Sequence, residues 1–153
     1  MSLNKLTLYL LGIVMFTNVA SAKLLLLYTC QIGEKPGVPQ YKLEIADSTF
    51  KIVFHSLLHK EKKQEQSGVL SSSEVKQLKQ IVQKLPEKLK VQSSSIAGFF
   101  KLTVIDAGFN KTLEGNSEAK QESLEGLIQW INNLHQNHQN LKSIAPIFPG
   151  DIN

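Results

Sequence analysis

The sequence predicts an α+β fold in which an antiparallel sheet of about four to five strands is packed by two helices. Residues 100–109 (Phe-Lys-Leu-Thr-Val-Ile-Asp-Ala-Gly-Phe) repeat the pattern of residues 41–50 (Tyr-Lys-Leu-Glu-Ile-Ala-Asp-Ser-Thr-Phe). Both segments alternate apolar and polar residues with the period of two that half-buried strands show. Helical apolar spacing follows each of them, at Val75, Leu78, Val82 and Leu85 and again at Leu124, Leu127, Ile131 and Leu134. We therefore interpret the chain as two strand–strand–helix units.

The first 22 residues have the features of a cleaved signal peptide. Residues 1–5 form a short basic segment, residues 6–16 are apolar apart from one threonine, and Ala20-Ser21-Ala22 is an A-x-A cleavage site. The apolar run is shorter than the roughly 20 residues that span a bilayer, so we favour cleavage over a retained anchor. We therefore expect a secreted or periplasmic protein without a membrane span after cleavage.

The mature chain is then expected to hold one α+β domain, residues 23–136, and a polar, Pro-containing tail, residues 137–153. Pro146 and Pro149 exclude a regular helix or a central strand in the tail. Its apolar residues are Ile144, Ile147, Phe148 and Ile152. Either the tail packs across the domain as an extended strap or it is exposed and offered to a partner. We favour the strap.

The first unit is preceded by the apolar run Leu24–Ile32, which has the length of a strand. Residues 41–45 and 50–54 then predict a hairpin, joined at Asp47-Ser48, whose side chains favour turns. Residues 59–67 contain no apolar side chain and predict an exposed loop.

The helix of the first unit has clear start and stop signals. Ser71 and Glu74 have the spacing of a capping box, in which each residue's side chain accepts a hydrogen bond from the other's backbone. Pro86 is expected to end the helix, because proline lacks the N–H that an interior helical position needs.

The second unit repeats this order. Its hairpin is expected to turn at Asp106-Ala107-Gly108, where the glycine can adopt a positive φ. Asn116 or Ser117 is the expected N-cap of the second helix, and Glu118 would then lie near the positive end of the helix dipole.

Three residues have both a functional and a structural interpretation. Cys30 is the only cysteine, which excludes an internal disulfide framework; its alternation with apolar residues favours burial over a reactive thiol. Trp130 either anchors a partner or seals the helix–sheet core, and we favour the core. Phe99 points opposite to its neighbour Phe100, so an open sheet face would present Phe99 and Ile105 as a candidate docking surface.

The charge pattern argues against nucleic-acid binding. All 17 basic residues are lysines, and removal of the leader leaves 16 of them against 13 acidic residues, a net charge of about +3. Proteins that read nucleic acids rely on arginine for bidentate contacts with guanine and phosphate, and this chain has none. We expect no nucleic-acid partner.

Candidate catalytic and metal-binding residues are sparse. His55 and His59 are four residues apart, and His135 and His138 three apart, but no carboxylate or cysteine stands at ligand spacing beside either pair. Sequence signatures of hydrolases are missing, and the matching turn positions explain Asp47 and Asp106 without catalysis. We therefore predict no enzyme activity, no catalytic or metal site and no cofactor.

A family resemblance follows from three motifs: Gly68-x-Leu70-Ser71-x-x-Glu74-x-x-x-Leu78, Phe100-x-Leu102-x-Val104, and Leu124-x-x-Leu127-Ile128-x-Trp130-Ile131. In this layout, residues 41–134 resemble the emfourin-type protealysin inhibitors. These are small bacterial proteins with a sheet backed by two helices, and members bind thermolysin-like metallopeptidases. The resemblance implies a peptidase partner. The leader and the long tail depart from the family pattern, so no inhibitory residue is carried over.

The leading hypothesis is an exported, non-enzymatic binding protein, with inhibition of a secreted or periplasmic peptidase as its sharpest form. An envelope-associated structural or secretion-accessory protein is the first alternative, and a cryptic hydrolase that uses one of the four histidines is the second. The sequence does not predict an oligomeric state.

Overall fold

The computed structural model describes residues 23–32, 40–56, 63–89, 98–116 and 121–150. Its six strands are β1 (Leu25–Ile32), β2 (Tyr41–Ala46), β3 (Thr49–His55), β4 (Lys63–Val69), β5 (Gly98–Asp106) and β6 (Phe109–Asn116). Its two helices are α2 (Ser72–Gln83) and α3 (Glu125–Asn137), and short 3₁₀ turns lie at Glu122–Leu124 and Gln139–Leu141. The predicted α+β class with two helices is confirmed. No helix within these residues is long and apolar enough to cross a membrane.

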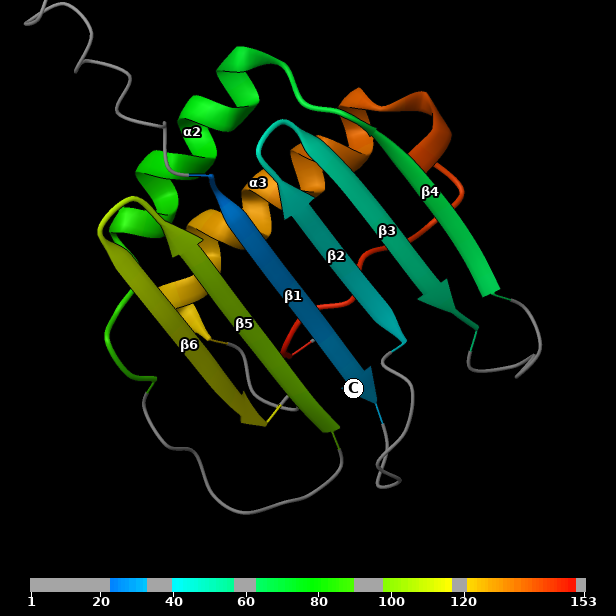
Figure 1. Ribbon diagram of the computed structural model, residues 1–153. Helices are drawn as coiled ribbons and strands as arrows, with labels where there is room; N and C mark the ends of the chain where they lie inside the picture. The colour runs from blue at the N-terminus through cyan, green and yellow to red at the C-terminus, as the bar shows by residue number, and fades with distance from the viewer. Residues whose placement is uncertain (1–22, 33–39, 57–62, 90–97, 117–120, 151–153) are drawn as a thin grey trace, which may run out of the picture.

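All six strands form one antiparallel sheet in the order β4-β3-β2-β1-β5-β6. Both helices lie behind this sheet in Figure 1, so the molecule has two layers and one sheet face without a covering element among the described residues. The core lies between the layers, where alternate strand residues meet the apolar stripes of the helices.

The sequence repeat corresponds to a common register on the two sides of β1. Equivalent residues of β2 and β5 pair with the same residue of the central strand. The pairs are Tyr41 and Phe100 opposite Cys30, Leu43 and Leu102 opposite Tyr28, and Ile45 and Val104 opposite Leu26. β1 belongs to neither unit, so the two-unit description holds for the flanking strands and helices but omits the strand at the centre.

The predicted number of strands was too low, and the predicted loop at residues 59–67 is the reason. Residues 63–67 are the first part of β4, an edge strand paired with β3; residues 59–62 lie outside the described residues. Because Gln66 and Gly68 meet the core side and Lys63 and Glu65 stand on the exposed side, β4 carries no apolar alternation from which a strand could be predicted.

The start of α2 follows the prediction, and the start of α3 does not. The Ser71 hydroxyl accepts a hydrogen bond from the Glu74 N–H at 3.2 Å, and the Glu74 carboxylate accepts one from the Ser71 N–H at 2.8 Å. Asn116, a predicted N-cap, is instead the last residue of β6. The 3₁₀ turn before α3 begins only after Gln121. Ser117 and Glu118 lie outside the described residues.

Cys30, Trp130 and the tail take the structural one of their two interpretations. Cys30 is fully buried in the core. Trp130 is 4% exposed, and its indole N–H donates to the Glu74 carbonyl at 3.2 Å, which joins α3 to the first turn of α2. Ile144 and Phe148 are buried, so the tail up to residue 150 packs as the strap alternative predicts. Ile152 lies outside the described residues.

Candidate functional site

The sheet face opposite the helices carries an exposed apolar row. Neighbouring strands place Val69, Thr49, Ala46, Leu25 and Ile105 side by side across β4, β3, β2, β1 and β5. We call these five residues the apolar row. Val69 is 66% exposed, Leu25 43% and Ile105 40%, and Leu27 stands beside the row at 38%. Large apolar side chains that gather on one uncovered face are typical of interaction surfaces.

The apolar row lies in a shallow hollow with a volume of about 790 Å³. Its lining comes from five strands: Ser67, Gly68, Val69, Thr49, Phe50, Lys51, Glu44, Ile45, Ala46, Leu25, Leu26, Leu27, Thr103 and Ile105. Adjacent strands are about 4.8 Å apart, so the hollow extends roughly 19 Å across the sheet. A segment of about five to six extended residues has that length.

Two hairpin turns border the same end of the face. The β2–β3 turn at Asp47-Ser48 and the β5–β6 turn at Ala107-Gly108 both lie next to the start of β1, because Leu25 pairs with Ala46 and with Ile105. Asp47 has a φ of 56° and Gly108 a φ of 85°, the left-handed backbone that tight turns require. Their four residues are exposed.

The prediction that Asp106 belongs to the second hairpin turn was wrong. Asp106 is the buried last residue of β5 and not a turn residue equivalent to Asp47. Its carboxylate accepts from the Ala107 N–H at 2.8 Å and lies 3.8 Å from the Lys79 ammonium on α2. The first contact stabilises the hairpin end itself and the second connects it to the helix layer, so Asp106 acts in the architecture of the turn.

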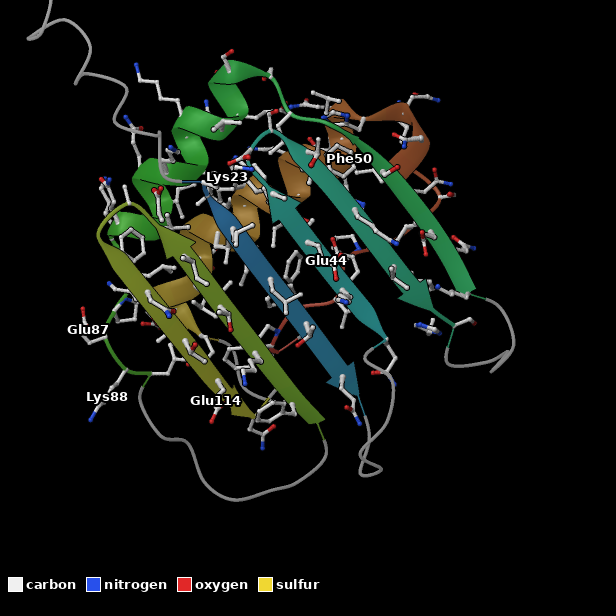
Figure 2. All side chains as sticks on the ribbon, viewed as in Figure 1. Lys23, Glu44, Phe50, Glu87, Lys88 and Glu114 are labelled. Carbon is white, nitrogen blue, oxygen red and sulfur yellow. The ribbon has the colours of Figure 1, made fainter. Side chains whose placement is uncertain are left out.

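The charged residues of the open face are paired with one another. Lys51 contacts Glu65 at 2.8 Å, and Lys101 lies 3.8 Å from Glu114; Lys42 also pairs with its neighbour on β2, Glu44. Figure 2 looks onto this face and labels Glu44 and Glu114. Hydrogen bonding to Glu65 raises the pKa of Lys51, and the same contact lowers the pKa of Glu65. The face therefore offers apolar contact more than net charge.

Both sheet edges carry features that oppose strand addition. On β4, the Asn140 side-chain amide donates to the Ser67 carbonyl at 3.1 Å. On β6, the Lys111 side chain turns to the helix layer, where its ammonium donates to the Leu85 carbonyl at 2.6 Å and lies 3.4 Å from Glu87. Inward charges and occupied edge groups hinder pairing with a further strand. The open face is therefore a better candidate for binding than either edge.

Of the two histidine pairs, only His135 and His138 are both among the described residues, and they make separate contacts. His55 ends β3, and its predicted partner His59 lies outside the described residues. His135 is 7% exposed and contacts the Tyr41 hydroxyl, whereas His138 contacts Glu74. Across the described ranges, no group of three or more His, Cys, Asp or Glu residues could hold a metal ion.

A Ser–Glu–His chain does occur, at the start of α2. The Ser71 hydroxyl donates to Glu74 at 2.9 Å, and the other Glu74 oxygen lies 3.2 Å from His138 Nε2. Activation of a serine requires the imidazole between hydroxyl and carboxylate, and here the carboxylate is in the middle. Burial would raise the pKa of Glu74, but hydrogen bonds from Ser71 and His138 lower it, which makes this carboxylate a weak base. The arrangement is that of a helix cap.

Sequence reasoning found part of the open face. Phe99 and Ile105 were predicted to lie there, and they are 47% and 40% exposed. Leu25, Leu27 and Val69 were missed. The continuous apolar run of β1 conceals its alternation, since both sheet faces of the central strand carry leucines. The folded sheet distinguishes the two sets, because the helices cover Leu24 and Leu26 on one face and leave Leu25 and Leu27 exposed on the other.

No protein-family model matches this sequence, and a search of curated proteins found no match.

Proposed function

We propose that this protein is an exported, non-enzymatic binding protein whose open sheet face binds another protein, with a secreted or periplasmic peptidase as the sharpest form of that partner. The observation that carries the proposal is the apolar row, which lies in a hollow about 19 Å across, beside two exposed hairpin turns at one end of the face. The leader features of residues 1–22 support export.

Burial of the row would supply the binding free energy. Transfer of apolar surface from water contributes about 25 cal/mol per Å², and a fully buried Leu or Ile side chain contributes about 1.5–3 kcal/mol. The row belongs to the hydrogen-bonded sheet, so little conformational freedom would be lost on binding. The paired lysines and glutamates around it would remain at a polar rim, as in ordinary protein interfaces.

Two features favour a peptidase among protein partners. The resemblance of residues 41–134 to the emfourin-type inhibitors implies one. The exposed turns at residues 47–48 and 107–108 would let an inhibitor present rigid loops to a cleft beside the apolar row. The tail is a poorer candidate for insertion, since Ile144 and Phe148 are buried against the domain. The loop at residues 33–39, a further candidate, lies outside the described residues.

The test is a titration of residues 23–153 against a panel of secreted peptidases that includes a thermolysin-like metallopeptidase, with residual activity as the readout. We expect stoichiometric inhibition of one class. Leu25→Glu and Ile105→Glu together should weaken it at least tenfold, because they remove two half-exposed apolar contacts and introduce charge. Gln77→Glu is the matched control, since Gln77 is exposed on α2 in the other layer.

Degradation of the protein while the peptidase stays active would refute inhibition. An equal loss of inhibition in the Gln77→Glu control would refute the assignment of the face. If no peptidase responds, release of the protein from the cell envelope by high salt would favour the envelope-associated alternative.

A further inference from the structure

The C-terminal strap, residues 138–150, is fixed to the domain through a buried polar cluster. Leu141, Ile144 and Phe148 of the strap are buried. The Tyr28 hydroxyl of β1 donates to the Ile147 carbonyl at 2.9 Å, and the Tyr28 ring lies 6.3 Å from that of Phe148. In Figure 1 the strap leaves the end of α3 and passes behind the sheet.

His135 is the centre of this cluster. It lies in the last turn of α3, 7% exposed, with Nε2 at 2.8 Å from the Tyr41 hydroxyl and Nδ1 at 3.4 Å from the Leu141 carbonyl. A carbonyl only accepts, so Nδ1 carries the hydrogen and Nε2 accepts from the Tyr41 O–H. Burial raises the pKa of Tyr41, which keeps its hydroxyl a donor. The neutral imidazole is thus satisfied at both nitrogens.

A second proton does not fit this arrangement. An N–H at Nε2 would face the Tyr41 hydroxyl, which would lose the acceptor for its own hydrogen inside the core, and a buried polar group without a partner is unfavourable. The imidazolium charge would also be buried. The titratable groups on the packed elements are Tyr28 and Cys30 on β1, Tyr41 on β2 and the exposed Lys142 on the strap. His138, which directly follows the last residue of α3, pairs with Glu74. No carboxylate interaction compensates His135 among the described residues.

We propose that His135 is a pH-sensitive latch, and that uptake of a proton at Nε2 in mildly acidic solution releases the C-terminal strap from the domain. Desolvation lowers the pKa of His135 from its usual value near 6.5, although backbone contacts with Leu141 and Ile144 act in the opposite sense. At pH values between the lowered pKa of His135 and about 6.5, the form with the strap released binds more of this proton than the form with the strap docked. The strap is therefore held above about pH 6.5 and loosens as the pH falls below it.

Release would uncover a second apolar surface, on the helix side of the sheet. The rings of Tyr28 and Tyr41, 6.1 Å apart, and the site vacated by Phe148 would become accessible. An acidic environment would thereby change which surfaces the protein presents, independently of the open face.

Hydrogen exchange, corrected for the intrinsic pH dependence of the rate, tests this latch. The reporters are the N–H of Leu141, bonded to the His138 carbonyl, and that of Ile144, bonded to the Leu141 carbonyl, both at 2.9 Å. Below pH 6.5 we expect their protection to fall by up to tenfold per pH unit, the limit for one proton. His135→Gln should remove this dependence, while His138→Gln, a neighbour outside the cluster, should retain it.

Unchanged strap protection between pH 7 and 5 in the unmodified protein would refute the latch, as would an equal pH dependence in His135→Gln. An NMR titration of the unmodified protein gives a reading that does not depend on the folding of any variant. The strap amides should shift with the midpoint of the His135 ring. A midpoint that instead matches His55 or His138 overturns the assignment.

Discussion

Gly68 and Gly126 provide a pair of glycine-to-alanine substitutions with opposite expected effects. A Cβ at Gly68 of β4 would stand 2.6 Å from Cζ and 2.7 Å from Cε1 of Phe50, whereas a Cβ at Gly126 of α3 would meet only Ile81 Cγ2, at 3.9 Å. Carbon atoms pack best at about 3.5–4.0 Å, so the first contact is about 1 Å too short and the second is ordinary.

The Phe50 ring has little room to move away. It is 2% exposed, and its centroid lies 4.8 Å from that of His138 in an edge-on contact. Overpacking of this kind costs about 1–3 kcal/mol, from which the reduced freedom of the unfolded chain subtracts about 0.4–1 kcal/mol. We therefore expect Gly68→Ala to lower the free energy of unfolding by about 1–2 kcal/mol. Gly126→Ala should raise it by about 0.5–1 kcal/mol, the helix propensity difference.

Urea unfolding followed by circular dichroism measures both differences. A Phe50→Leu background supplies the decisive control: if the ring causes the loss, Gly68→Ala should cost clearly less in Phe50→Leu than in the original protein. A neutral or stabilising Gly68→Ala would refute the argument from the Phe50 contact, as would a cost that is unchanged when the ring is absent.

Two further predictions concern Glu74 and Lys111. Glu74→Gln should lower stability by about 1–2 kcal/mol at neutral pH; because the hydrogen bonds lower the Glu74 pKa, this difference should shrink as the pH falls below about 4.3, as acid-titrated unfolding would show. A difference that persists at low pH would assign the effect to geometry alone. Lys111→Val should promote self-association through the β6 edge, measured by sedimentation velocity, because it removes the inward ammonium bonded to Leu85. Lys84→Val at the exposed end of α2 should leave the protein's association state unchanged, and equal association of both variants would contradict the edge argument.

The sequence predicted those strands and helices that have an apolar face toward the core and a polar face toward solvent. The hairpin strands alternate because one side meets the helices, and the helix stripes are clear for the same reason. β4 was missed because its core side carries Gln66 and Gly68, which leave no apolar period, and at Gly68 the Phe50 ring occupies the space of a side chain. The apolar pattern within residues 63–69 cannot reveal this strand, because β4 forms by pairing with β3.

The candidate surface and the buried histidine depend on contacts distant in sequence. Leu25 is exposed because its side chain lies on the sheet face opposite the helices, and β5, 80 residues later, places Ile105 beside it on that face. His135 sits in a polar helix end that predicts solvation, yet it is buried between Tyr41 and the Leu141 carbonyl. Neither arrangement has a signal within a short window. The spacing of His135 and His138 was interpreted without a metal site, and it gave no sign of their separate contacts with Tyr41 and Glu74.

The position of β1 has a consequence for folding during synthesis. β1, the first strand among the described residues, lies in the middle of the sheet, and one of its neighbours, β5, pairs Lys101 with Thr29 across 72 residues of sequence. A nascent chain therefore cannot complete its sheet until most of its length has been made, and contacts this remote in sequence slow folding. Under the export proposed above, that delay would prolong the unfolded state that can pass through a membrane channel. A circular permutant that begins at β2 and carries β1 after β6 would keep the same sheet, but it would alter the order in which the strands become available.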